Sequence, residues 1–213
     1  MAVAAKICGI TDHRAMAAAV SGGAAFVGLV FFPPSPRFVQ PGRAAELLDG
    51  VPEQVTRVGL FVDADDALLD HVLTQVRIGL IQLHGNESPE RVEAIRLEYG
   101  LPVMKSIPVA TAADLARADD YIEAADWLLF DAKAPPGSVL PGGNAVTFDW
   151  TALAGRSWPL PWMLAGGLTS ANVAEAIRIT GAEAVDVSSG VEDAPGVKNP
   201  EKIRAFLKAV AAV

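Results

Sequence analysis

The sequence predicts an α/β protein built as a single (β/α)8 barrel, a TIM barrel, over residues 1–213. Short apolar runs rich in Val, Ile, Leu and Phe alternate with helical patterns along the chain. Strands that alternate with helices pair in parallel, because a parallel pair needs a long crossover between its strands. Eight such units fit into 213 residues, which is the size of a compact barrel of this kind.

The expected elements follow one another in regular order. The predicted strands lie near residues 3–8, 26–32, 57–62, 78–84, 102–107, 127–131, 162–165 and 184–188. The predicted helices lie near residues 12–21, 42–49, 65–76, 89–99, 112–124, 150–155, 170–180 and 200–211. An open, doubly wound sheet is the alternative architecture. It usually has fewer strands, and no G-x-G-x-x-G follows the first strand.

Several helix boundaries carry capping signals. Ser88 and Asn199 each precede a proline, which is typical of a helix start. Thr111 and Asp114 have the spacing of a capping box. Asp63 with residues 65–66 is interpreted as a helix cap followed by an acidic first turn. Left-handed helix ends are predicted at Gly100 and Gly181.

Composition excludes several classes of function. With 51% hydrophobic and 20% charged residues, the chain is typical of soluble globular proteins. A net charge of −8 repels nucleic acids, and no apolar run is long enough to span a membrane. No secretion signal is recognisable, and one cysteine cannot form an internal disulfide, so the cytoplasm is expected. Three scattered histidines predict no metal site.

Two loops at the carboxyl ends of the last strands are predicted to bind phosphate. The active site of a TIM barrel lies at these strand ends, and its phosphate site usually follows strands seven and eight. Gly166 and Gly167 follow the seventh predicted strand, and Ser188, Ser189 and Gly190 follow the eighth. Glycines let backbone N–H groups approach an anion closely. The alternative is that these glycines only form tight turns.

Three other strand-end residues are candidates for chemistry. Cys8 ends the first strand and is interpreted as a base or nucleophile, or else as a small buried apolar residue. Asp131 follows an apolar run, where desolvation favours the protonated form of a general acid. The alternative role of Asp131 is a salt bridge to Lys133 or Lys6. Arg37 lies in a proline-stiffened loop, which would place its guanidinium group to bind a carboxylate. The alternative is a surface arginine exposed to solvent.

Strand alternation adds one structural prediction. If Cys8 points into the barrel, Lys6 does too, and the same holds for Ser188 and Asp186. The first and last strands are neighbours in a closed barrel, so a structural Lys6–Asp186 pair is expected beneath Cys8. A second role in lowering the pKa of Cys8 follows from the charge of Lys6.

His84 is expected chiefly to support a neighbouring loop. The glycine-rich segment 136–144 either closes over a ligand or is a passive loop.

The ordered motifs resemble phosphoribosylanthranilate isomerases over nearly the whole chain. They include KICGIT (6–11), SPR (35–37), QLHG (82–85), LFD (129–131), a Gly-Gly pair (142–143), LAGGL (164–168) and DVSSGVE (186–192). The first and last of these together are highly specific. One departure lies in the loop after Gly143, where Asn144 is followed by Ala145 instead of glycine. An alanine is strained where positive φ is required.

The resemblance implies an Amadori rearrangement of a phosphoribosyl anthranilate without any cofactor. It implies Asp131 as the general acid that opens the ribose ring and Cys8 as the base that removes the proton from C2′. Arg37 would bind the anthranilate carboxylate and the last two loops the phosphate. The expected substrate-contacting residues are Arg37, His84, Gly142, Gly143, Gly166, Gly167, Asp186, Ser188, Ser189 and Gly190. A monomer and a homodimer are both compatible with the sequence.

Other phosphosugar barrels fit the sequence less well. Indole-3-glycerol-phosphate synthase would be expected to show a catalytic lysine and glutamates at strand ends. Ribulose-phosphate epimerase would need metal-ligating histidines and paired aspartates. A histidine-pathway isomerase would be expected to show paired aspartates at its strand ends. A non-catalytic barrel that senses a phosphorylated metabolite remains the alternative from a different class of function.

Overall fold

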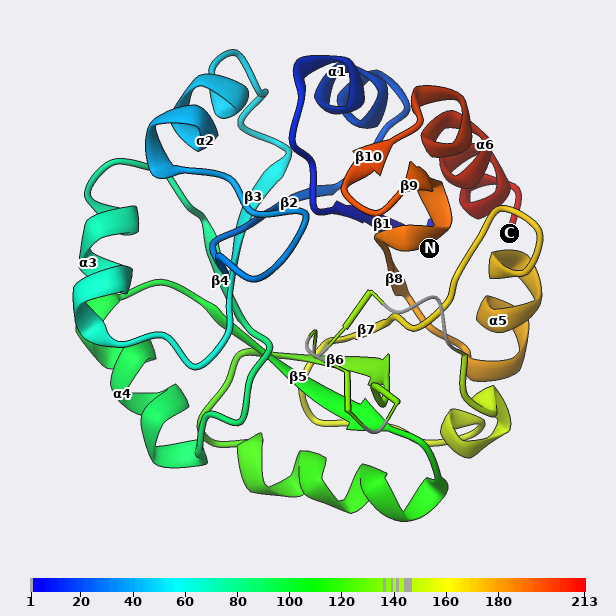
Figure 1. Ribbon diagram of the computed structural model, residues 1–213. Coiled ribbons are helices and arrows are strands. Elements are labelled where there is room, and N and C mark those ends of the chain that lie inside the picture. The colour runs from blue at the N-terminus through cyan, green and yellow to red at the C-terminus, as the bar shows by residue number, and fades with distance from the viewer. Residues whose placement is uncertain (1, 136, 139, 141, 144–146) are drawn as a thin grey trace.

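The protein is described by a computed structural model that covers residues 2–135, 137–138, 140, 142–143 and 147–213. Within these residues, parallel strands close into a barrel in the order β1 to β8, which confirms the predicted (β/α)8 fold. Figure 1 looks along the barrel and shows the helices forming an outer ring. The strands are β1 Ala4–Cys8, β2 Phe26–Val30, β3 Thr56–Phe61, β4 Leu80–Leu83, β5 Val103–Val109, β6 Trp127–Ala132, β7 Trp162–Leu164 and β8 Ala184–Val187.

The connecting segments are mostly α-helical. The α-helices are α1 His13–Ser21, α2 Pro41–Leu48, α3 Asp66–Leu73, α4 Pro89–Tyr99, α5 Val173–Thr180 and α6 Pro200–Ala211. Two connections expected as α-helices are instead 3₁₀ helices, η1 Ala112–Tyr121 and η2 Trp150–Leu153. The buried residues of η1 are Leu115, Ala118 and Tyr121, each three positions apart. That spacing matches the three residues per turn of a 3₁₀ helix.

Most helix ends have the predicted caps. The side chains of Ser88 and Asn199 accept backbone hydrogen bonds at the starts of α4 and α6, and Thr111 begins η1 with a capping box. Gly100 and Gly181 end their helices with φ of 59° and 70°.

The interpretation of Asp63 as a helix cap is wrong. The side chain of Asp65 caps α3. Asp63 instead has a φ of 47° and accepts a 2.6 Å hydrogen bond from the backbone N–H of Asn86. Its side chain therefore ties the loop after β3 to the loop after β4.

Apolar side chains fill the barrel below the strand ends. The buried interior cluster consists of Val58, Leu80, Met104, Leu129, Met163, Ala165 and Ala184. A second, larger cluster lies between the barrel wall and the helices. Bulky packed side chains are the usual filling of such a barrel, which is therefore a solid core and not a pore. This packed layer forms a rigid floor beneath the residues at the strand ends.

A short hairpin after β8 was not predicted from the sequence. The 3₁₀ turn η3 Ser189–Val191 leads into β9 Glu192–Ala194, which pairs antiparallel with β10 Val197–Lys198. Gly196 makes the turn with a φ of 81°. A side chain at Gly196 would overlap the carbonyl oxygen of Pro36, so the hairpin packs closely against the loop after β2. Figure 1 shows it above the amino-terminal strand, beside α6.

No helix in the described part of the chain is long and apolar enough to cross a membrane.

Candidate active site

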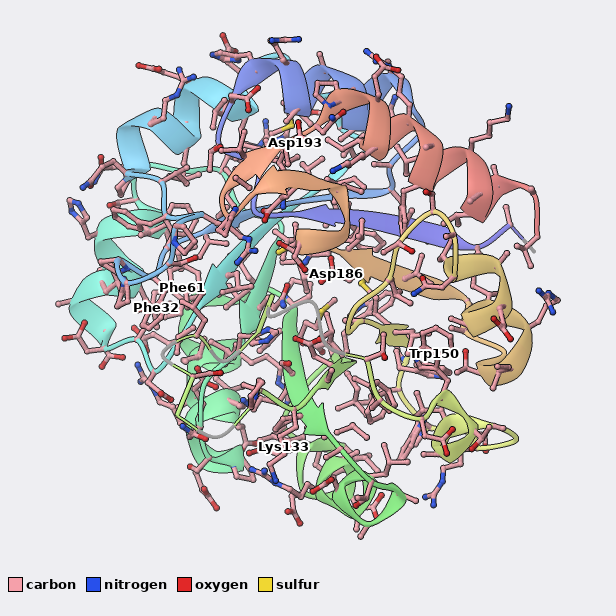
Figure 2. All side chains as sticks on the ribbon, turned by 45° about the vertical axis from the view of Figure 1, so that its right-hand side comes forward. Phe32, Phe61, Lys133, Trp150, Asp186 and Asp193 are labelled. Atoms are coloured by element: carbon pink, nitrogen blue, oxygen red, sulfur yellow. The ribbon has the colours of Figure 1, made fainter. Side chains whose placement is uncertain are left out.

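All twelve residues that the sequence analysis assigned to catalysis or substrate contact line one cleft at the carboxyl ends of the strands. About 770 Å³ of space lies within and at the mouth of the cleft, part of it open solvent. These residues are Cys8, Arg37, His84, Asp131, Gly142, Gly143, Gly166, Gly167, Asp186, Ser188, Ser189 and Gly190. Figure 2 shows the labelled Asp186 near the middle of the barrel, beside β8. The fold therefore brings together residues from six of its strand–loop junctions.

The predicted pair of Lys6 and Asp186 is present at the base of the cleft. Lys6 Nζ donates to Asp186 Oδ1 at 3.0 Å, and the lysine is fully buried. Gly28 on β2 makes room for this arrangement. A Cβ there would come within 3.1 Å of Cys8 Sγ and 3.3 Å of Lys6 Cε. Sequence alternation thus predicted this contact correctly, because register across β1 and β8 places the two residues side by side.

The thiol of Cys8 has a raised pKa. Burial of the thiol is the largest cause, and the charge of Asp186 adds to it. The positive charges of Lys6 and Lys198 oppose the rise without cancelling it. Lys6 thus lowers the pKa of Cys8, as expected from the sequence, but burial outweighs its effect and the net shift is upward. The pKa of Lys6 is itself raised: burial alone would lower it, but Asp186 and Cys8 outweigh burial.

A carboxyl group, an imidazole and an amide form a second cluster across the cleft. Asp131 Oδ1 accepts from the N–H of Ala132 at 2.9 Å, and Oδ2 lies 3.2 Å from His84 Nε2. His84 Nδ1 lies 3.0 Å from Gln82 Nε2. The side chain of His84 therefore contacts the candidate acid, and Gln82 is a site residue that the sequence analysis did not select.

The two lysines considered as salt-bridge partners of Asp131 lie elsewhere. Lys133 pairs with Asp114 at 3.8 Å near the surface, and Lys6 pairs with Asp186. The carboxyl group of Asp131 is 11% exposed, so it lies within the wall of the cleft with one edge toward the ligand space.

Arg37 is buried and already binds a carboxylate of the chain itself. Its Nε and Nη2 atoms donate to the two oxygens of Glu192 at 2.8 and 2.9 Å. Nη2 also donates to the carbonyl oxygen of Gly143 at 3.2 Å. The solvent-exposed alternative for Arg37 is thus excluded. One edge of the guanidinium group is held by Glu192, and the group is fixed in the wall of the cleft.

Glu192 and Lys198 hold two of the loops together and were assigned no role from the sequence. Lys198 Nζ donates to Glu192 Oε1 at 2.6 Å and to the carbonyl oxygen of Ser188 at 2.9 Å. Burial opposes ionisation of Glu192, but Arg37 and Lys198 outweigh it and lower its pKa. Burial also lowers the pKa of Lys198, against the effect of Glu192. The signal in the sequence was weak: a glutamate and a lysine flank a short turn at Gly196.

The glycines of the loops after β7 and β8 are required by close backbone approach. Gly166 and Gly167 have φ of 89° and 63°, and a Cβ at Gly166 would lie 2.7 Å from the backbone nitrogen of Ala132. A Cβ at Gly190 would overlap the carbonyl oxygen of Leu168. Helix α5 begins at Val173, slightly later than expected, after a turn that follows the glycine pair.

Gly142 and Gly143, from the segment after β6, lie against three side chains of the cleft. A Cβ at Gly142 would lie 2.5 Å from His84 Nε2 and 2.7 Å from Asp131 Oδ2. Gly143 has a φ of 73° and lies against Arg37. Asn144 and Ala145, where the motif departs from the family pattern, lie outside the described residues.

Among the described residues, no group of three or more His, Cys, Asp or Glu side chains is arranged to hold a metal ion. The site instead presents a thiol, a carboxyl group and an arginine at the mouth of a parallel barrel, with glycine loops after β7 and β8. These features define a TIM-barrel enzyme.

A family model described as N-(5'phosphoribosyl)anthranilate (PRA) isomerase matches residues 5–209. The chain belongs to the phosphoribosylanthranilate isomerase family, which confirms the resemblance seen in the sequence.

Two bacterial isomerases of this family match nearly the whole chain in sequence. An N-(5'-phosphoribosyl)anthranilate isomerase of Paramagnetospirillum magneticum is 70% identical, over 98% of this chain and 97% of its own length. The isomerase of Rhodospirillum rubrum is 62% identical, with 96% of both chains covered.

Solved structures give the same result. The crystal structure of phosphoribosyl anthranilate isomerase from Thermotoga maritima has a TM-score of 0.88 at 35% identity, with 99% of this chain and 100% of that chain covered. A structure of the isomerase in complex with reduced 1-(o-carboxyphenylamino)-1-deoxyribulose 5-phosphate has a TM-score of 0.83 at 33% identity, with the same coverage.

Proposed function

We propose that Cys8 and Asp131 catalyse the isomerisation of N-(5-phospho-β-D-ribosyl)anthranilate to 1-(o-carboxyphenylamino)-1-deoxyribulose 5-phosphate in this cleft. This is the third step of the tryptophan branch from chorismate. Membership of the family supports the overall reaction. The observation that carries the assignment of roles is that Cys8 and Asp131, from strands far apart in the sequence, line the same cleft as Arg37.

Asp131 acts as the general acid in the first half of the reaction. Its carboxyl proton passes to the ribose ring oxygen as the bond between that oxygen and C1′ breaks. The lone pair of the anthranilate nitrogen forms the C1′=N double bond, so a Schiff base results and Asp131 becomes a carboxylate. Positioned acids of this kind typically contribute about 10²–10⁴-fold in rate. The nitrogen lone pair supplies the driving electrons, so the step requires no cofactor.

Cys8 acts as the general base in the second half. Its thiolate removes the proton from C2′, and the electrons of that C–H bond form the enolamine as the C1′=N electrons return to nitrogen. The enolamine then tautomerises to the ketone. Because the pKa of Cys8 is raised by burial, most of the free enzyme at neutral pH carries the thiol, and only the thiolate fraction can act. A raised pKa also makes the thiolate a stronger base once it is formed.

Two anion sites orient the substrate. Arg37 faces the anthranilate carboxylate with the part of its guanidinium group that Glu192 does not hold. The loops after β7 and β8, with Gly166, Gly167 and Ser189 in the wall of the cleft, bind the phosphate. Positive φ at the two glycines lets backbone N–H groups approach an anion without a side chain between them.

The remaining expectations complete the proposal. Residues 1–213 act as one catalytic domain in the cytoplasm, as a monomer or a homodimer. The isomerase of Thermotoga maritima, a solved relative 34% identical to this chain, is dimeric. This relative supports the homodimer for this chain.

The direct test is an assay with phosphoribosylanthranilate, generated in the reaction mixture because it is labile, that follows the loss of anthranilate fluorescence. The proposal expects turnover without added metal or cofactor and its loss in Cys8→Ala. Tight binding of the substrate without turnover would favour the alternative, a barrel that senses a phosphorylated metabolite.

A further inference from the structure

Gln82, His84 and Asp131 form a continuous chain of contacts from the barrel interior to the cleft. Gln82 is fully buried on β4, and its Nε2 lies 3.0 Å from Nδ1 of His84. The other ring nitrogen, Nε2, lies 3.2 Å from Oδ2 of Asp131. Each member of the chain therefore constrains the hydrogen positions of the next.

The hydrogen-bond accounting at Gln82 fixes the orientation of its amide. With Nε2 toward His84, the buried carbonyl oxygen Oε1 has no protein partner among the described residues. The opposite orientation would place the NH₂ group at that buried position and leave two donors unsatisfied. Buried carbonyl oxygens without a partner are tolerated more often than buried N–H groups. The amide therefore points its N–H at His84.

This orientation determines the protonation of His84. Nδ1 faces an N–H donor, so it must be an acceptor and carry no hydrogen. The neutral imidazole then carries its hydrogen on Nε2 and donates it to Asp131 Oδ2. An imidazolium would place an N–H group against the N–H of Gln82, so the charged form of His84 is disfavoured.

We propose that Gln82 is a positioning residue that keeps His84 as the neutral Nε2–H tautomer, so that the transferable proton of the pair resides on Asp131. This inference rests on the proposed role of Asp131 as the acid. If His84 took that proton, an imidazolium–carboxylate pair would form and Asp131 would have none to donate. With the proton on Asp131, Oδ2 accepts from His84 on one side and directs its own O–H toward the substrate on the other.

The other groups around His84 do not supply a competing charge. From β5, Ser106 Oγ lies 3.5 Å from His84 Nε2. Lys105 from the same strand pairs with Glu87 at 2.6 Å, so these charges offset each other. From the loop after β3, the carboxylate of Asp63 accepts from the backbone of Asn86. Asp131 is therefore the carboxylate in direct contact with the imidazole within the described structure.

The first test is ¹⁵N NMR of the histidine side chains in the unmodified enzyme. The chain has only three histidines, and His13 and His71 lie on α1 and α3 away from the cleft, so the His84→Asn spectrum assigns the His84 signals. The inference predicts that Nε2 of His84 carries hydrogen and Nδ1 does not at pH 7. An imidazolium at His84 at pH 7, or the Nδ1–H tautomer, would overturn it.

The second test compares Gln82→Glu with Gln82→Leu. A glutamate offers Nδ1 a charged acceptor, so it should convert His84 to an imidazolium at neutral pH. The variant should lose about tenfold or more in kcat, and its ¹⁵N spectrum should show hydrogen on both ring nitrogens of His84. Gln82→Leu removes the donor without adding an acceptor, so His84 should stay neutral and kcat should fall less.

The chain offers a matched control for these variants. Gln75 Nε2 lies 3.2 Å from Nδ1 of His71 on the exposed surface of α3, so Gln75→Glu makes the same change of charge beside a histidine outside the cleft. It should leave kcat and the His84 signals unchanged. A loss of kcat in Gln82→Glu with a neutral His84 would show a purely structural role and overturn the inference. If the variants fail to fold, the spectrum of the unmodified enzyme decides. An inactive wild-type enzyme with the predicted tautomer would instead contradict the proposed function.

Discussion

Lys6 and Asp186 meet across the seam where the barrel closes: they are register partners on β1 and β8, and Nζ lies 3.0 Å from Oδ1. Lys6 has no exposed surface. Removing one member of a buried ion pair leaves an uncompensated charge, whereas replacing both with apolar residues often has little cost. The pair therefore stabilises the seam only while both partners are present.

Lys6→Met should lower the free energy of unfolding by about 3–5 kcal/mol, because Asp186 is left buried and unpaired. The double variant Lys6→Met with Asp186→Leu should recover most of this loss. Denaturant unfolding of the three proteins measures both differences. A single variant as stable as the unmodified chain would show that the pair contributes nothing to the seam.

The reactivity of Cys8 should increase with pH beyond the range of an ordinary thiol. Burial and the charge of Asp186 raise its pKa in the folded protein, and only the thiolate reacts with alkylating reagents. Because Cys8 is the only cysteine, the rate of iodoacetamide labelling, followed by mass spectrometry, reports this one group. A half-maximal rate below the ordinary thiol pKa of about 8.5 would contradict the burial argument.

The sequence predicted the elements and strand ends well because their signals are local. Apolar periodicity marks each strand, and a strand end in a barrel is also a position in the cleft, which is how Cys8, Arg37 and Asp131 were selected. The pair of Lys6 and Asp186 required only strand alternation and closure.

Other features depend on tertiary contacts that no local pattern encodes. The hairpin β9–β10 has strands of three and two residues, too short for a periodic signal, so Glu192 and Lys198 were given no role. The direction of the pKa shift of Cys8 depends on the balance between burial and three neighbouring charges. Strand position in the sequence indicates which charges lie near Cys8, but it does not indicate how deeply the thiol is buried.

Glu192 should make the fold sensitive to acid. Burial opposes its ionisation, yet Arg37 and Lys198 hold its pKa below the ordinary value of 4.5. A carboxyl group with a lower pKa in the folded state contributes stability above its unfolded pKa and loses it as pH falls through the folded pKa. Stability should therefore fall below about pH 4.5, and less steeply in Glu192→Gln. Urea unfolding at a series of pH values measures this, and equal acid dependence in both proteins would exclude the contribution.

Inorganic phosphate should stabilise the fold through the loops after β7 and β8. A ligand that binds only the folded state at 100 times its Kd adds about 2.7 kcal/mol. Gly190→Ala should abolish the increase in melting temperature, because a Cβ there would overlap the carbonyl oxygen of Leu168. Gly42→Ala is the matched control, since nothing lies within 4 Å of the added carbon. An equal increase in both variants at fixed ionic strength would place the phosphate elsewhere.

The steady-state kinetics of Cys8→Ser and Asp131→Asn with phosphoribosylanthranilate test the acid–base assignment most directly. Both changes keep the shape of the side chain while removing the base or the acidic proton. With folding checked by melting temperature, each variant should lose at least about 10²–10⁴-fold in kcat with a much smaller change in KM. Turnover by either variant at near the rate of the unmodified enzyme would contradict the assignment, even if the substrate is correct.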